Sequence, residues 1–197
     1  MKGLKTGRIM TGMVAGAMLT ATPALAGFMF SATIDENQEV PVRGSDATGT
    51  ATLELSDDQT ALSIHIVVEG LDFDGLQTPD DPLDDVGGLH IHRQVAGVNG
   101  PVIFGFIGPN SDTNDQRTID IDGLTATIFS IWDGDEGNGT TLGAELTSLF
   151  NQGLYINVHT TEWPGGVIRG QIIPEPASLA LMGLAGLVTL RRRRARV

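Results

Sequence analysis

The amino-acid sequence predicts an all-β domain, an antiparallel β-sandwich or barrel with Greek-key connections and one short helix. Between residues 27 and 173, apolar and polar side chains alternate with a period of two, as they do in half-buried strands. Glycine-rich turns separate these alternating stretches. The chain contains no cysteine, so the domain depends on its own core, or on bound ions, rather than on disulfides.

Nine short stretches carry the strand pattern, and turn signals such as Asn99-Gly100-Pro101 and Pro164-Gly165-Gly166 separate them. We expect strands at residues 28–34, 48–55, 61–69, 89–92, 101–106, 118–122, 124–131, 154–159 and 167–173. The stretch at residues 154–159 places its leucine, isoleucine and valine on one face, and Tyr155, Asn157 and His159 therefore share the other face.

One segment follows a helical period instead. Its apolar residues recur at i, i+4, i+7 and i+8, and they are Leu142, Leu146, Leu149 and Phe150. Thr140 or Thr141 can serve as the N-cap, and Gly153 can end the helix. We therefore expect a single short helix that closes one end of the β core.

Residues 1–26 have the pattern of a secretory signal peptide. Three cations precede an apolar run that ends in Ala24-Leu25-Ala26, so Ala24 and Ala26 form a cleavage site of the A-x-A kind. The expected partner is signal peptidase, and the expected route is export through the inner membrane. An uncleaved membrane anchor is the alternative interpretation.

Residues 174–197 form a three-part tail. Pro174-Glu175-Pro176 precedes the apolar residues 177–190, and a cluster of basic residues follows, namely Arg191, Arg192, Arg193 and Arg194. A helix of this length spans about 21 Å, less than the ~30 Å hydrocarbon core of a membrane. The tail resembles the PEP-CTERM sorting signal of Gram-negative bacteria. This resemblance implies an exosortase that removes the tail near Pro174-Glu175-Pro176, whereas a retained weak anchor is the alternative.

The charge of the chain is very uneven. Between residues 27 and 173 there are 23 acidic residues and four arginines, whereas both terminal segments are basic. Such an acidic domain repels phosphate backbones, so nucleic-acid binding is not expected. Basic residues tend to stay on the cytoplasmic side, so both ends predict that the acidic domain lies outside the membrane. Residues 72–88 hold six aspartates and two prolines, which indicates a long acidic loop.

Several motifs of the middle segment resemble the CHRD domain, a family of secreted proteins. In order along the chain they are FSATI at 30–34, NQEVP at 37–41, TGTA at 48–51, LHIH at 89–92, NGPV at 99–102, YINVHT at 155–160 and PGGVIRGQ at 164–171. The resemblance covers nearly all of residues 27–173. It implies an extracellular β domain without an established catalytic activity, in agreement with the fold predicted above.

A second resemblance concerns the histidines. Gly87-Gly88-Leu89-His90-Ile91-His92 and the later Val158-His159 strand are similar to two copper-binding strands of the Cu/Zn superoxide dismutase barrel. This similarity implies that His90, His92 and His159 match three copper ligands, although the metal-bridging histidine and the zinc ligands have no match. It also implies a sandwich of the superoxide-dismutase type, as an alternative to an immunoglobulin-like one.

The spacing of the histidines agrees with a shared metal. His90 and His92 stand two apart on a strand, so both point to one face with their Cα atoms about 6.5 Å apart. His159 also faces away from the apolar side of its strand. Copper or zinc is the cofactor that such a cluster could hold. The preferred interpretation is that the three imidazoles are solvated or have a structural role, because the sequence shows no fourth ligand.

A third candidate site lies in a glycine-rich acidic turn. Asp133, Asp135 and Glu136 offer hard oxygen ligands suited to Ca²⁺, but the run fails the EF-hand pattern. A solvated acidic turn is the preferred interpretation, so calcium is a weaker expectation than copper or zinc.

Two functional hypotheses follow from the sequence. The first is an exported, surface-sorted, non-enzymatic CHRD domain, a binding or matrix module whose partner is extracellular polysaccharide or another surface protein. The second, kept as the alternative, is a copper- or zinc-binding metalloprotein with redox activity at a superoxide dismutase-like site built on His90, His92 and His159. No catalytic residue is predicted, and the membrane is contacted only through the terminal segments.

Overall fold

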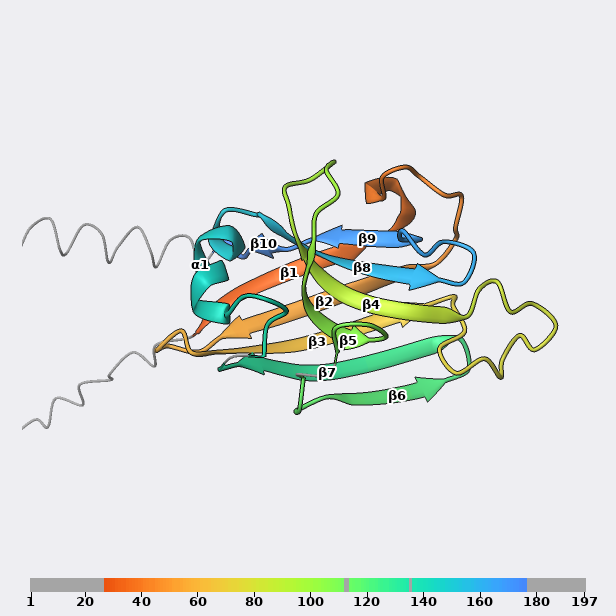
Figure 1. Ribbon diagram of the computed structural model, residues 1–197, viewed down its shortest axis with the longest axis horizontal. Helices are drawn as coiled ribbons and strands as arrows, with labels where there is room; N and C mark the ends of the chain where they lie inside the picture. Colours follow the sequence, from red (N-terminus) through yellow and green to blue (C-terminus); the bar gives the residue numbers. More distant parts are fainter. Residues whose placement is uncertain (1–26, 112–113, 135, 177–197) are drawn as a thin grey trace, which may run out of the picture.

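A computed structural model describes residues 27–111, 114–134 and 136–176, and over these residues the fold is mostly β, with two antiparallel sheets, one α-helix and one 3₁₀ helix (Figure 1). The strands are β1 (Phe28–Ile34), β2 (Thr48–Leu55), β3 (Ala61–Glu69), β4 (Val86–Arg93), β5 (Val102–Ile107), β6 (Thr118–Asp122), β7 (Thr125–Asp133), β8 (Leu154–Thr160), β9 (Ile168–Gln171) and β10 (Ile173–Pro174). The helices are η1 (Glu36–Gln38) and α1 (Leu142–Phe150). The predicted antiparallel all-β class is therefore confirmed.

The larger sheet has six strands in the order β10-β1-β2-β3-β7-β6. Its strands alternate as the sequence predicts: in β3, Leu62, Ile64, Ile66 and Val68 are fully buried and the residues between them are not. The inward side chains meet those of the second sheet, and Trp132 at the end of β7 stacks on Phe104 of β5 with ring centroids 4.9 Å apart. This apolar layer between the two sheets is the core.

The smaller sheet has four strands in the order β5-β4-β8-β9. Every residue of β8 and β9 is buried, including the polar ones on the outer face. Loops therefore cover that face, whereas the outer face of β3 in the larger sheet bears exposed residues such as His65. This covered polar face holds the candidate site.

The predicted strand at residues 167–173 was wrong in one respect, because the chain changes sheets within it. Ile168–Gln171 pairs with β8 in the smaller sheet, whereas Ile173 and Pro174 pair with β1 in the larger one. Ile172 makes the crossing: its side chain is fully buried and its N–H donates to the carbonyl oxygen of Leu154 at 2.9 Å. A single period of two cannot reveal such a change of partner.

The predicted helix is confirmed as α1, and it lies at one end of the two sheets (Figure 1). The side chain of Thr141 is the N-cap and accepts a hydrogen bond from the N–H of Ala144 at 3.3 Å. The ring of Phe150 packs against those of Phe28 and Phe30, with centroid distances of 5.1 and 5.4 Å. The apolar stripe of α1 therefore contributes to the core.

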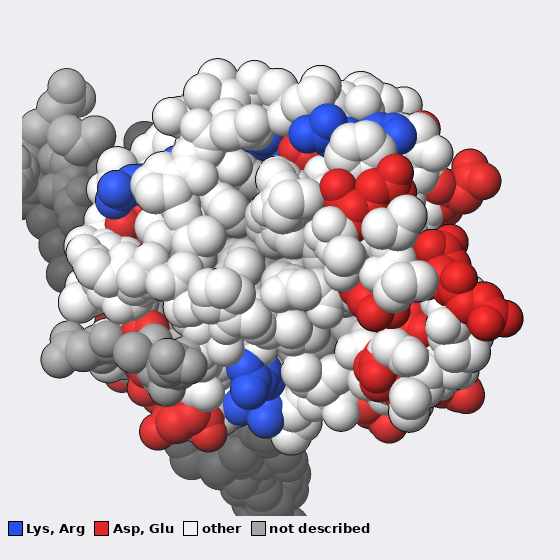
Figure 2. Space-filling view, turned by 45° about the vertical axis from the view of Figure 1, so that its right-hand side comes forward, with Lys and Arg blue, Asp and Glu red and all other residues white. Residues whose placement is uncertain are grey.

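The acidic loop predicted near residues 72–88 connects β3 to β4 and extends from one end of the sheets (Figure 1). Figure 2 shows Asp and Glu side chains gathered along one side of the molecule, while the middle of the same face carries almost no charge. No helix among the described residues is long and apolar enough to cross a membrane. The predicted signal peptide and apolar tail, with Ala24, Ala26 and Arg191 to Arg194, lie outside those residues.

Candidate metal centre

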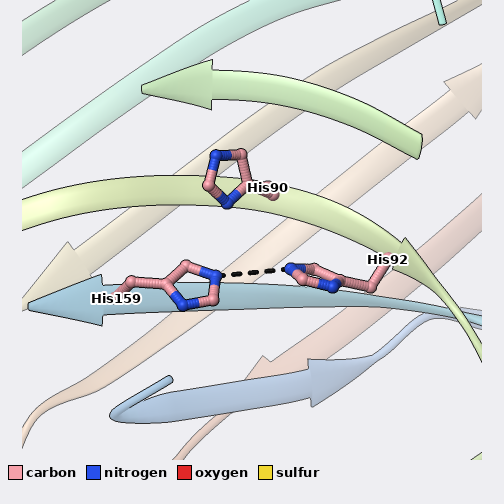
Figure 3. Close-up of side chains that lie close together, drawn as sticks. All are labelled: His90, His92 and His159. Carbon is pink, nitrogen blue, oxygen red and sulfur yellow. Dashed lines mark hydrogen bonds between the residues drawn. The ribbon is translucent and has the colours of Figure 1, made fainter. Parts of the chain in front are cut away.

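Three histidines meet on the covered face of the smaller sheet. His90 and His92 point outward from β4 because Leu89 and Ile91, which alternate with them, are fully buried in the core. His159 comes from the neighbouring strand β8, where it stands opposite Gly88. Figure 3 shows the three rings converging above β4 and β8. Strand pairing thus brings together residues that are 67 positions apart in the sequence.

The spacing of the ring nitrogens suits a single ion. The Nε2 atoms of His92 and His159 are 3.3 Å apart, and one nitrogen from each of the three rings lies within 4.8 Å of the others. Two nitrogens bound at 2.0–2.1 Å with a tetrahedral angle are about 3.3 Å apart. A pair at the 4.8 Å limit would have to approach by about 1.5 Å to reach that separation. The cluster is therefore close to a coordinating geometry.

A backbone carbonyl orients each ring. His90 Nε2 lies 2.8 Å from the oxygen of Pro109, His92 Nδ1 lies 2.9 Å from that of Gly100, and His159 Nδ1 lies 3.1 Å from that of Pro164. A carbonyl oxygen can only accept, so each of these nitrogens carries the ring hydrogen. The remaining nitrogens are then His90 Nδ1, His92 Nε2 and His159 Nε2, each with a free lone pair.

These three lone pairs have no adequate donor. His90 Nδ1 is buried and has no hydrogen-bond partner. The contact between His92 Nε2 and His159 Nε2, dashed in Figure 3, needs a hydrogen between two acceptors. If either ring carried its hydrogen on Nε2 instead, the lone pair of its Nδ1 would face a backbone carbonyl oxygen, which cannot donate. A cation shared by the three nitrogens satisfies all of them, and histidines that ligate metals are commonly held by such carbonyl contacts.

An extra proton is not a favourable substitute for that cation. Burial and, to a smaller extent, repulsion from the neighbouring rings lower the pKa of His90 and of His159 to about 4. Burial, together with the nearby positive charge of Arg169, also lowers the pKa of His92. All three rings are therefore neutral at pH 7, which is the form that binds metals.

Tyr155 and Arg169 form a stack of side chains that packs against His92. The Tyr155 ring lies parallel to that of His92, at 5.0 Å and 15°, and the guanidinium of Arg169 lies 3.7 Å from the Tyr155 ring centre. The Tyr155 hydroxyl accepts a hydrogen bond from the N–H of Gly100, the residue whose carbonyl binds His92. Arg169 donates to Asn99 Oδ1 and to the carbonyl oxygens of Val95 and Val98. The stack therefore fixes the loop that holds His92.

The sequence placed the histidines on the outer face but did not reveal this supporting shell. His90, His92 and His159 are only 5%, 6% and 9% exposed, because the loops that supply the carbonyls also cover the rings. The turn motifs Asn99-Gly100-Pro101 and Pro164-Gly165-Gly166 are the available signals, since both contain a carbonyl that contacts a histidine. Pro109 carried no comparable signal.

Two of the predicted calcium ligands, Asp133 and Glu136, lie elsewhere and form hydrogen bonds within the protein. The carboxylate of Glu136 accepts hydrogen bonds from the N–H groups of Asp115 and Asp133, and Asp133 Oδ2 accepts one from Gln116. Asp135 lies outside the described residues. Within the described part of the chain, the one cluster of three or more ligand-type side chains close enough to share an ion is His90, His92 and His159. Calcium binding stays a prediction.

The first residues of the predicted sorting signal belong to the fold. Pro174 is buried and stands opposite Phe30 in β10, and the N–H of Glu175 donates to the carbonyl oxygen of Met29 at 2.9 Å. Pro176 is exposed. The first two residues of the predicted sorting signal are therefore part of the folded domain.

Comparisons with known proteins found two families in this chain. The CHRD domain matches residues 30–172, and the PEP-CTERM protein-sorting motif matches residues 173–194. No curated protein and no solved structure matches the chain. The sorting motif implies processing by an exosortase, with export and sorting to the cell surface.

Proposed function

We propose, from the premise that this chain belongs to the CHRD domain family and carries a PEP-CTERM sorting motif, that it is a non-enzymatic metal-binding module of the cell surface or extracellular matrix. His90, His92 and His159 hold the ion. The observation that carries the proposal is the convergence of one nitrogen from each ring within 4.8 Å, with carbonyls holding the rings.

The donor set favours zinc or copper over calcium. Imidazole nitrogen suits Zn²⁺ and copper, whereas Ca²⁺ requires six to eight oxygen ligands. The 3.3 Å separation of the His92 and His159 Nε2 atoms fits a tetrahedral ion. The 90° angles of tetragonal Cu²⁺ would bring the same atoms to about 2.9 Å. Zn²⁺ is therefore the ion that fits this pair of nitrogens with the smaller rearrangement.

The similarity to the copper ligands of superoxide dismutase supports the same three residues, but dismutation is no part of the proposal. The chain has four histidines. The fourth, His65, is exposed on the outer face of β3 in the other sheet and cannot act as a metal-bridging ligand here. The likeness therefore supports metal binding and not the reaction.

Calorimetric titration and elemental analysis of the purified protein test this proposal. Zn²⁺ should bind with one equivalent per chain, and His92→Ala should weaken binding at least 100-fold. His65→Ala is the matched control, since it removes an imidazole that lies outside the cluster. The proposal fails if the wild-type protein binds no Zn²⁺ or Cu²⁺, or if the two variants lose affinity equally.

The role in the matrix has a separate test. A cleft of about 340 Å³ has a lining of mixed polar and apolar side chains, and in it Arg43 stacks on Trp163 with 4.6 Å between the guanidinium carbon and the ring centre. An aromatic ring among charged and polar side chains suits a sugar. We expect extracellular polysaccharide to retain the protein and Trp163→Ala to reduce retention. Free passage of the wild-type protein through that matrix would contradict this role.

A further inference from the structure

The histidine cluster opens into a cavity. A pocket of about 560 Å³ lies over the three rings and is bordered by Asn110, Thr160 and Pro164 among others. None of the described residues that line it is Asp, Glu, Lys or Arg. Carboxylates outnumber arginines by 23 to four between residues 27 and 173, so the uncharged lining formed by the described residues distinguishes this pocket from the acidic loop.

An ion bound to the cluster would have too few protein ligands. Zinc in proteins usually has four ligands, and structural sites take all four from the chain, whereas sites that exchange ligands keep one position for an outside molecule. The described residues supply three imidazoles and no further ligand-type side chain close enough to join them, and the chain has no cysteine. The pocket is where a fourth ligand has room to bind.

The charge around the cluster selects the class of that ligand. Three neutral imidazoles leave the two positive charges of the ion uncompensated, and a charge buried in this way is costly. Arg169 acts on His92 across Tyr155, and Arg43 lies near Gly165 at the pocket rim, but both guanidinium groups also interact with the buried carboxylate of Glu39. The positive potential in the pocket therefore comes chiefly from the bound ion. An anion is the favoured ligand.

We propose that the metal centre keeps an open coordination position that faces this pocket and binds a small monovalent anion in exchange with solution. The inference rests on the proposed function, since it needs the ion to be held by His90, His92 and His159. In this proposal the metal ion binds an outside ligand and does not only stabilise the fold. The ligand it recognises is a small anion.

Azide is the probe, and the purified protein loaded with Cu²⁺ is the sample. Elemental analysis first establishes one copper per chain, and electron paramagnetic resonance and visible absorption then follow an azide titration. We expect a saturable change in both spectra that converts all of the bound copper, with the same titration curve for His65→Ala.

The possible outcomes separate the two proposals. Full copper loading with spectra that azide leaves unchanged at saturating concentration would overturn the open position, while the metal site itself would stand. Failure to load copper or zinc would overturn the proposed function, and the open position would fall with it. A partial spectral change that grows linearly with azide and never saturates would also overturn the inference, because it indicates nonspecific displacement of the ion.

Discussion

Two buried polar regions of this domain, the Asp72 carboxylate and the histidine cluster, differ in how their acceptors are satisfied. Asp72 is fully buried at the start of the acidic loop, and its two oxygens accept hydrogen bonds from the N–H groups of Asp74, Gly75, Gln77 and Thr78 and from the Thr78 hydroxyl. The histidine cluster is almost as buried, yet its three inward nitrogens face one another and no donor.

The difference separates a buried polar group whose acceptors are all satisfied by the protein from one that has acceptors left for a ligand. Burial alone would raise the pKa of Asp72, but donors from the backbone outweigh it and hold that pKa far below its ordinary value. The charged carboxylate is therefore complete without a ligand. The histidines are oriented just as firmly by three carbonyls, but on the side away from the cluster. Orientation without internal satisfaction indicates a place for an ion.

The largest loss of stability should come from removing the carboxylate of Asp72. Asp72→Ala would remove the acceptor of four part-buried backbone N–H groups, and because water can reach some of these donors we expect the free energy of unfolding to fall by about 3 kcal/mol in total. Asp72→Asn keeps one acceptor oxygen and should cost less. Chemical denaturation measures both, and Asp74→Ala, on the exposed part of the loop, is the control. An Asp72→Ala protein as stable as this control would refute the comparison.

Metal should stabilise the cluster and leave the Asp72 region unaffected. At a free Zn²⁺ concentration 100 times Kd, the free energy of unfolding should rise by about 2.7 kcal/mol. A chelator should reverse the rise. His159→Ala should abolish it, whereas Asp72→Asn should retain it in full. Thermal denaturation with and without Zn²⁺ measures this, and equal responses of the two variants would contradict the assignment of the ligands.

Acid should weaken the metal-free domain through the histidines. The pKa of His90 and His159 is about 4 in the folded state and near 6.5 when unfolded, so the unfolded state binds more protons between these values. Stability is therefore greatest above pH 6.5 and falls as pH drops toward 4, by at most about 1.4 kcal/mol per pH unit for each histidine. His90→Ala should flatten this slope between pH 6.5 and 5, and a slope of unchanged steepness would count against the buried neutral rings.

The smallest effect should come from the supporting stack. Tyr155→Phe keeps the ring under His92 but removes the hydroxyl that accepts from Gly100, the residue that orients His92. Loss of such an indirect partner typically lowers metal affinity by 10- to 100-fold, and we expect about 10-fold because the carbonyl contact itself remains. Calorimetry on Tyr155→Phe and His65→Ala makes the comparison. A loss as large as that of His92→Ala would mean that Tyr155 has a more direct role.

The sequence predicted most of the fold because the larger sheet obeys a simple alternation. The stretches at residues 28–34, 48–55, 61–69 and 118–122 became β1, β2, β3 and β6 with the predicted boundaries. The strand at residues 167–173 did not, since Ile172 crosses between sheets, and alternation says nothing about which neighbour a strand chooses.

The candidate site was predicted only as far as residue types allow. The motif His90-Ile91-His92 fixes two rings on one face, and the resemblance to copper-binding strands singled out His159. Their supporting contacts come from backbone oxygens of Gly100, Pro109 and Pro164, and any residue type can supply a backbone oxygen. The loops that bury the rings also depend on long-range packing, such as Arg169 against Tyr155. No local pattern encodes those contacts.

X-ray absorption spectroscopy of the zinc-loaded protein tests the metal centre most directly. It should show three imidazole nitrogens at about 2.0–2.1 Å, together with one further light-atom ligand. His65→Ala should give the same spectrum, and His92→Ala should lose one imidazole or the ion itself. A shell made only of oxygen atoms, or one that His65→Ala alters, would show that zinc binds elsewhere on this acidic protein.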